Sequence, residues 1–109
     1  MKMTALAMSV TDWTQVPLVD HPGDSGVASW RTQTFAEIRV RMVEYSPGYS
    51  ADHWCSKGHV ILCLEGAFDI ELADGKRLTL KAGQSYHVGD GEPAHRSSTT
   101  LGAKLFIVD

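Results

Sequence analysis

One dipeptide restricts the fold of this chain more than any other feature. Asp74-Gly75 stands between residues 68–72 and 78–80, two runs in which apolar and polar side chains alternate. Alternation with a period of two is typical of a β-strand with one buried face. Asp-Gly between two such runs is a strong signal for a tight hairpin. The sequence therefore predicts a β-hairpin at this point.

The same period recurs nearer the N-terminus. Residues 27–35 are rich in β-favouring types, among them Trp30, Thr32 and Thr34. Residues 38–43 alternate strictly, and we expect their more apolar set to face the core and two arginines to face solvent. The expected inward set is Ile38, Val40 and Met42, and the expected outward set is Arg39, Arg41 and Val43.

Residues 59–64 and 105–108 are apolar on both faces and predict two further strands. If His59 points inward, then Ile61 and Cys63 do so as well, since side chains two apart share a face. The opposite face then needs a cover, from the N-terminal segment or from a second copy of the chain. It would carry Val60, Leu62 and Leu64.

Turn residues separate these runs at regular intervals. Ser46-Pro47-Gly48, Glu65-Gly66 and Ala82-Gly83 each predict a turn, and no stretch has a helical period. Several short strands joined by glycine-rich turns are typical of an all-β barrel or sandwich. The 109 residues predict one domain. We expect residues 27–109 to form it and residues 1–26 to be an arm that packs on it or on a partner.

Charge and composition exclude some classes of partner. The chain has 10 Lys and Arg against 13 Asp and Glu, and no basic cluster, which argues against nucleic acid and against an anionic membrane surface. No run approaches the roughly 20 apolar residues of a membrane span. Two cysteines, Cys55 and Cys63, are too few for a secreted disulfide framework, so a cytoplasmic location is the simpler expectation.

Four side chains that bind metals well are spaced to meet. His53 and Cys55 share a face if they lie on a strand, and His59 follows Gly58, a turn residue. His95 is the best remaining candidate for a further ligand. Imidazole nitrogen and thiolate sulfur are donors that zinc and similar ions prefer. The sequence thus predicts a metal site.

The spacing around these residues resembles the first motif of the cupin superfamily. That motif reads glycine, His-x-His, glutamate and glycine. Here Gly48, His53-x-Cys55, His59 and Gly66 stand at the corresponding positions. Cys55 replaces the second histidine and His59 replaces the glutamate. The resemblance is greatest to the small cupins named for an Asp-His-Cys-Trp motif, although here tryptophan precedes cysteine.

The second cupin motif, glycine, Pro-x-Gly and histidine, is also recognisable. Gly83, Gly89-Asp90-Gly91 and His95 correspond to it, with Gly89 in place of proline and His95 one residue late. The resemblance implies a jelly-roll, or double-stranded β-helix, barrel. It also implies a bound metal and, from family habit, a homodimer. It implies no reaction, since no activity is firmly assigned to that group of small cupins.

The types of donor limit which ion can bind and which chemistry it can support. Histidine and cysteine ligands favour one divalent transition ion, zinc before nickel, copper or iron. One hypothesis is a Lewis-acid enzyme that acts on a small polar molecule. Four protein ligands would close a tetrahedral zinc shell, so the alternative is a non-catalytic binding or sensing domain, with a structural metal or a redox-sensitive Cys55. A pocket without metal is a third hypothesis.

Other residues receive simpler interpretations. Tyr86 is a candidate pocket residue whose hydroxyl would reach a ligand, and Cys63 is expected in the core. Trp54 is expected to pack in a sheet or subunit contact. His87 and Arg96 are expected at the surface.

Overall fold

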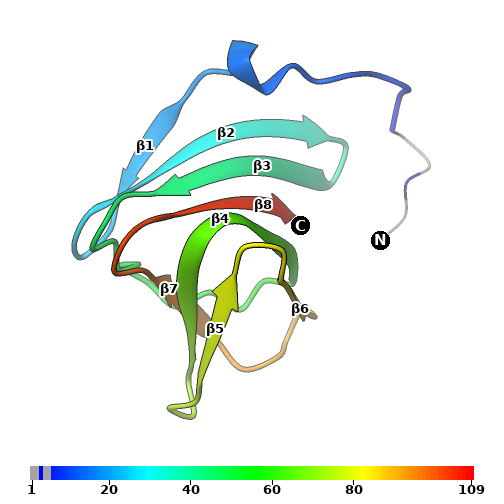
Figure 1. Ribbon diagram of the computed structural model, residues 1–109. Helices are drawn as coiled ribbons and strands as arrows, with labels where there is room; N and C mark the ends of the chain where they lie inside the picture. The colour runs from blue at the N-terminus through cyan, green and yellow to red at the C-terminus, as the bar shows by residue number, and fades with distance from the viewer. Residues whose placement is uncertain (1–2, 4–5) are drawn as a thin grey trace.

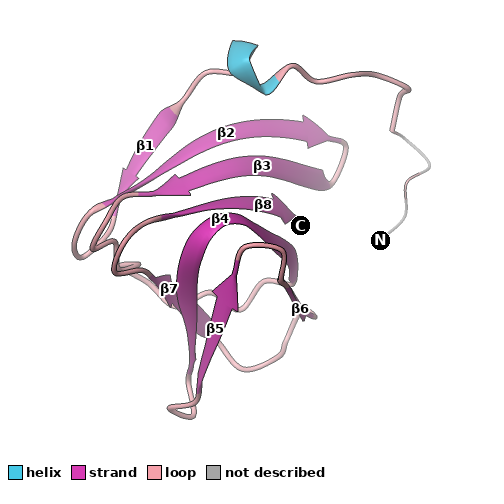
Figure 2. Ribbon diagram, in the orientation of Figure 1, coloured by secondary structure: helices cyan, strands magenta, loops and turns pink. Residues whose placement is uncertain are grey.

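The computed structural model describes Met3 and residues 6–109, so residues 1–2 and 4–5 of the predicted arm lie outside the described part. The described chain is built almost entirely of strands, which confirms the all-β class (Figure 2). Within it, no helix has the length and apolar character to cross a membrane. The elements are the 3₁₀ helix η1 (Trp13–Gln15) and the strands β1 (Val19–Pro22), β2 (Val27–Phe35), β3 (Ile38–Tyr45), β4 (His59–Leu72), β5 (Arg77–Lys81), β6 (Ser85–Val88), β7 (His95–Ser98) and β8 (Ala103–Val108).

Strand β4 pairs with more strands than any other described element. The strands follow the order β1-β2-β3-β8-β4-β5, and β6 and β7 also pair with β4, all antiparallel. The first residues of β4 pair with β6 and β8, and its last residues pair with β5 and β7. In Figure 1 this long strand curves from one half of the molecule into the other. The core lies inside this curve, with Val43, Cys63, Phe68, Ile70 and Leu105 fully buried.

The predicted hairpin at Asp74-Gly75 is confirmed. It joins β4 to β5, with Ile70 opposite Leu78 in the ladder. Gly75 has a φ of 91°, a conformation that glycine adopts without strain. The Gly75 amide donates to the Leu72 carbonyl, and the Asp74 carboxylate accepts from the Lys76 amide.

The predicted turn at Glu65-Gly66 is wrong. Both residues lie inside β4, where the register against β8 shifts between Cys63 and Glu65. Gly66 has a φ of 73°. A bulge of this kind bends a strand without ending it, and it lets β4 pass from one half of the sheet to the other.

The predicted faces of β3 are reversed at Arg41 and Val43, whereas Ile38 is buried, as predicted. Arg41 is only 5% exposed and Val43 only 2%. Arg41 pairs with Ile107 and Val43 with Leu105, both buried residues of β8. A period of two defines two faces but does not say which one is buried. Here Arg39 and Arg41 face the barrel interior because both pair with the buried carboxylate of Asp109.

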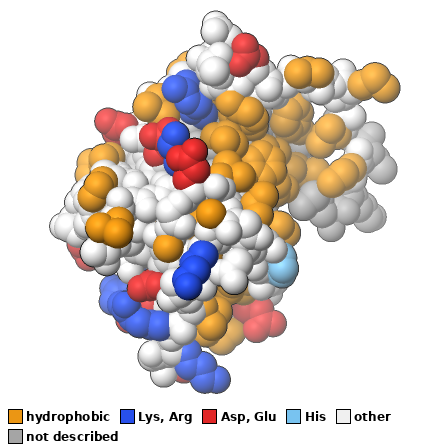
Figure 3. All heavy atoms as spheres, in the orientation of Figure 1, with side chains coloured by type: hydrophobic (Ala, Val, Ile, Leu, Met, Phe, Trp, Pro, Cys, Tyr) orange, Lys and Arg blue, Asp and Glu red, His pale blue; other side chains and the backbone are white. Residues whose placement is uncertain are grey.

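The N-terminal segment covers part of the outer surface. The Trp13 ring in η1 packs edge-on against Phe106 of β8, and Arg31 donates to the Val16 carbonyl. The outward side chains of β4 are less covered: Val60 is 44% exposed and Leu64 is 38%. Apolar side chains gather on one side of the molecule beside the N-terminal segment (Figure 3).

Replacement of Gly66 tests the bulge. A Cβ at Gly66 would lie 2.3 Å from the Gly102 carbonyl oxygen, in addition to the strain of its positive φ. Gly75 also has a positive φ, but a Cβ there meets nothing within 4 Å. We expect Gly75→Ala to lower the free energy of unfolding by about 1–2 kcal/mol and Gly66→Ala by about 1–3 kcal/mol more. Equal losses in urea unfolding would show that the close approach is unimportant.

Candidate metal centre

Backbone pairing sets two of the predicted ligands side by side. Cys55 lies in the loop before β4, and His95 is the first residue of β7. The Cys55 amide donates to the His95 carbonyl at 2.8 Å, and the His95 amide donates to the Cys55 carbonyl at 2.9 Å. This isolated antiparallel bridge holds the backbones of the two residues next to each other.

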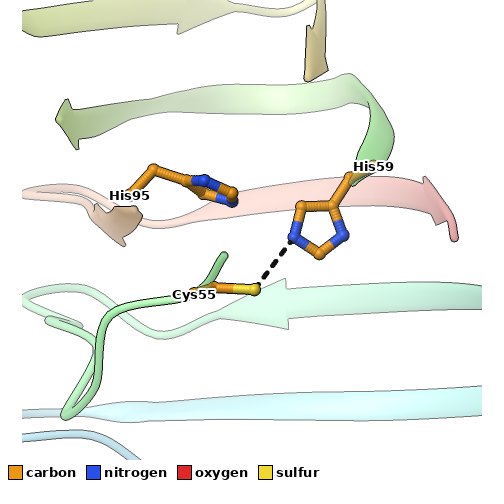
Figure 4. Close-up of side chains that lie close together, drawn as sticks. All are labelled: Cys55, His59 and His95. Atoms are coloured by element: carbon orange, nitrogen blue, oxygen red, sulfur yellow. Dashed lines mark hydrogen bonds between the residues drawn. The ribbon is translucent and has the colours of Figure 1, made fainter. Parts of the chain in front are cut away.

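His59 completes a cluster with Cys55 and His95. It is the first residue of β4, and its Nε2 lies 3.3 Å from the Cys55 sulfur (Figure 4). The imidazoles of His59 and His95 are edge to face with 5.1 Å between ring centres. One donor atom from each of the three residues lies within 4.8 Å of the other two. The structure thus brings together three of the four predicted ligands in a cluster able to hold one metal ion.

The donor separation fits a tetrahedral ion. Bond lengths of about 2.3 Å to sulfur and about 2.0 Å to nitrogen place those two donors about 3.5 Å apart in a tetrahedral zinc site. The observed separation of the Cys55 sulfur and His59 Nε2 is 3.3 Å. Small side-chain movements are enough to match the two values.

His95 supplies independent evidence for a bound group. The residue is 3% exposed, and neither of its buried ring nitrogens has a hydrogen-bond partner. Burial, with a contribution from nearby His59, lowers the pKa of His95 below its usual value, against a smaller opposing effect of the Pro93 backbone, which lies outside hydrogen-bond geometry. The neutral ring offers a lone pair, as metal ligation requires. Buried polar atoms without partners are costly, and a metal ion would provide one nitrogen with its partner.

Asp109 fixes the orientation of His59. Its Oδ2 lies 2.8 Å from His59 Nδ1. A proton on Nδ1, shared with this carboxylate, leaves the Nε2 lone pair directed at the cluster. This carboxylate–histidine arrangement commonly supports metal-ligating histidines and increases their basicity.

The Asp109 side chain is completely buried and fully paired. Arg39 binds it through Nε and Nη2 at 2.9 and 3.0 Å, and Arg41 Nη2 donates at 2.9 Å. Burial alone would raise the pKa of Asp109, but the bonds from His59 and Arg39 and the charge of Arg41 hold it well below its usual range. The carboxylate is therefore ionised throughout the physiological range.

His53 and Tyr86 occupy other positions. The His53 side chain is 71% exposed, and its Nδ1 lies 2.7 Å from the Asp52 carboxylate. His53 borders the cavity but lies outside the three-residue cluster. Tyr86 contacts the His95 ring, with 5.8 Å between ring centres, rather than lining the cavity beside the cluster.

Other side chains also differ in part from expectation. Trp54 is 42% exposed, outside the core, and Arg96 lies over its ring at 4.4 Å. Cys63 is fully buried and His87 is exposed, as predicted. Both cysteines are free thiols.

A cavity of about 120 Å³ adjoins the cluster.

Three charged residues near the cluster were not predicted to belong to the site from the sequence, namely Arg39, Arg41 and Asp109. One signal was available for Asp109: it continues the inward alternation of Leu105 and Ile107, and a carboxylate at such a position needs a buried partner.

Comparisons with known proteins define the class. No protein-family model and no curated protein matches the sequence. Among solved structures, an RmlC-like cupin from Shewanella frigidimarina is 18% identical with a TM-score of 0.71, over 96% of this chain and 92% of that chain. Ectoine synthase from P. lautus is 16% identical with a TM-score of 0.74, over 93% and 76%.

A third structure, Fe(II)-HppE with an alternative substrate, is 15% identical with a TM-score of 0.76, over 94% of this chain and 60% of that one. At these identities the likeness establishes the fold. The chain is a small cupin-fold protein, as the motif spacing predicted.

Removal of the Asp109 charge tests the buried ion cluster. Asp109→Asn leaves two guanidinium groups without their counter-charge, and we expect it to lower the free energy of unfolding by about 3–5 kcal/mol at pH 7. The native pKa is depressed, so the stabilisation is present above the unfolded-state pKa of about 4 and is lost as the pH falls further. The difference between wild type and variant should therefore shrink between about pH 4 and pH 2.

Urea unfolding of protein kept in EDTA measures this difference without interference from metal loss. Asp24→Asn is the matched control, because Asp24 is exposed and its side chain has no ion pair among the described residues. A difference between wild type and Asp109→Asn that stays constant down to pH 2 would contradict the assigned role.

Proposed function

We propose that this chain is a metal-dependent cupin that binds one transition ion, zinc in preference to nickel, copper or iron, through Cys55, His59 and His95. The observation that carries the proposal is His95, a buried imidazole with two unpartnered nitrogens beside a thiol and a second imidazole. One thiolate and two imidazoles are borderline-soft donors, which favours zinc.

Three protein ligands favour an open site over a closed one. Structural zinc sites use four protein ligands, whereas catalytic sites use three and leave one position for substrate. The exposed His53, bonded to Asp52, lies outside the donor set. This supports a Lewis-acid enzyme that acts on a small polar molecule. The ion's contribution in such a site is to polarise a substrate oxygen.

The residues around the cluster suit this role. Asp109 holds the His59 ring through Nδ1, so its other nitrogen is directed to the ion. Burial raises the pKa of Tyr49, with contributions from Tyr45 and Asp52, to about 12. Its hydroxyl therefore stays protonated and offers a hydrogen-bond donor at the cavity wall. Ile61 and Ile107 provide apolar wall and restrict water.

Metal content of ligand variants tests the proposal. Elemental analysis of protein purified without a nickel column should find about one ion per chain. His95→Ala and Cys55→Ser should lose most of it, because each removes a donor. Asp109→Asn should weaken zinc binding about 10–100-fold, because it removes only the support of a ligand. Circular dichroism of each variant checks that it has folded.

His53→Ala is the matched control and separates the two functions. We expect it to keep its ion, and X-ray absorption should then show one sulfur, two imidazoles and one further light ligand. Loss of the ion from His53→Ala would show that His53 joins the shell. That result would favour the alternative, a metal- or redox-sensing domain in which the thiol of Cys55 is the sensor. No metal uptake by wild type would overturn both.

The exposed outer face of β4 supports a further proposal, that two copies associate there as a homodimer. Val60 and Leu64 are large apolar residues left 44% and 38% exposed on one strand. Light scattering coupled to gel filtration should give twice the chain mass. Val60→Glu should produce a monomer, whereas Leu101→Glu should not, because the exposed Leu101 lies in the loop before β8. A wild-type monomer would contradict the proposal.

A further inference from the structure

The cavity beside the cluster has a strongly cationic wall. Its lining includes Arg39, Arg41 and Arg96. Among the described residues, no aspartate or glutamate lines the cavity. Arg96 is paired away from the cavity with Glu71, at 3.3 Å. Arg39 and Arg41 share the single carboxylate of Asp109 with His59 and with the half-exposed Lys57, whose Nζ lies 3.8 Å from it. Positive groups therefore outnumber the one carboxylate they share.

Arg41 is held in place and has a buried donor without an acceptor. It is 5% exposed, its Nη2 donates to Asp109, and its guanidinium lies 4.4 Å from the centre of the Trp30 ring. Its Nε is buried and has no hydrogen-bond partner among the described residues. A buried cationic donor without an acceptor is costly, and it is well suited to donate a hydrogen bond to an anionic ligand.

The size and walls of the cavity limit that ligand. A cavity of about 150 Å³ in another protein admits benzene, a molecule of about six heavy atoms, and this one has a volume of about 120 Å³. Trp30, Val43 and Ile107 supply apolar and aromatic wall. The excess positive charge favours an anion, and the apolar wall favours a monocarboxylate with a short organic group over phosphate, which is polar on every side.

We propose that the cavity binds a small monocarboxylate, with one carboxylate oxygen accepting from Arg41 Nε. The identification of this cavity as the substrate site rests on the proposed function, because it places the ligand beside the ion held by Cys55, His59 and His95. Arg41 and His59 bind the same oxygen of Asp109, so the anion-binding donor and the metal ligand are held in a fixed relation. If the proposed function holds, the substrate is a carboxylate with about six heavy atoms or fewer inside the cavity.

Propionate and propionamide form a matched pair for the test, since they have the same shape and differ in charge. Each is titrated into full-length protein at constant ionic strength, with and without zinc, while the arginine Nε–H signals are followed by NMR. Propionate should saturate and shift the Arg41 signal, and propionamide should not. Shifts of equal size with both compounds, or no saturation with propionate, would overturn the inference. Tighter binding of inorganic phosphate would also overturn it.

Arg41→Lys keeps the positive charge and removes the Nε donor. It should weaken propionate binding about tenfold or more. Arg77→Gln, a change at an exposed arginine outside the cavity, should leave binding unchanged. Equal affinity in wild type and a folded Arg41→Lys would overturn the inference. If Arg41→Lys does not fold, the wild-type Arg41 signal decides the matter alone.

The zinc-loaded and zinc-free titrations separate this inference from the proposed function. Zinc uptake without propionate binding would overturn only the carboxylate site. Propionate binding at Arg41 in a protein that takes up no metal would overturn the metal-dependent function and support the carboxylate site.

Discussion

The buried carboxylate of Asp109 is the interaction on which both the fold and the site depend. An ionised group with no exposed side-chain surface needs close partners. Arg39 and Arg41 of β3 and His59 of β4 provide them. Their convergence explains why the arginine face of β3 is turned inward and why the His59 ring presents Nε2 to Cys55. The network that stabilises this one buried charge therefore also orients His59 within the candidate metal-binding cluster.

Much of the architecture could be predicted from local sequence patterns. The Asp74-Gly75 hairpin and the spacing of Cys55, His59 and His95 depend on residues close in sequence or on motif distances. The orientation of Arg41 could not be found this way, since its partner Asp109 lies 68 positions further along the chain. Strand alternation predicts that His53 shares a face with Cys55, but His53 lies in a loop, where alternation does not apply.

The cavity carries two kinds of side chain that can bind a ligand. A cluster of soft donors occupies one wall, and fixed guanidinium groups occupy another. The cupin fold supports many chemistries and does not select among them. In this chain the selection comes from its departures from the common motif: Cys55 and His59 change the donor set, and Arg41 adds a charged donor inside the barrel. These side chains, rather than the fold, define what the protein can bind.

The path of β4 has a consequence for how the molecule comes apart. Because this one strand pairs with β6 and β8 at one end and with β5 and β7 at the other, neither half of the sheet can separate without breaking its ladder. Proteins usually open in contiguous cooperative units. Here the strand that begins with His59 belongs to both halves, so we expect both halves of the sheet to open together. Cys55 lies in the loop before this strand, so its backbone bridge to His95 is the part of the donor cluster that we expect to open first.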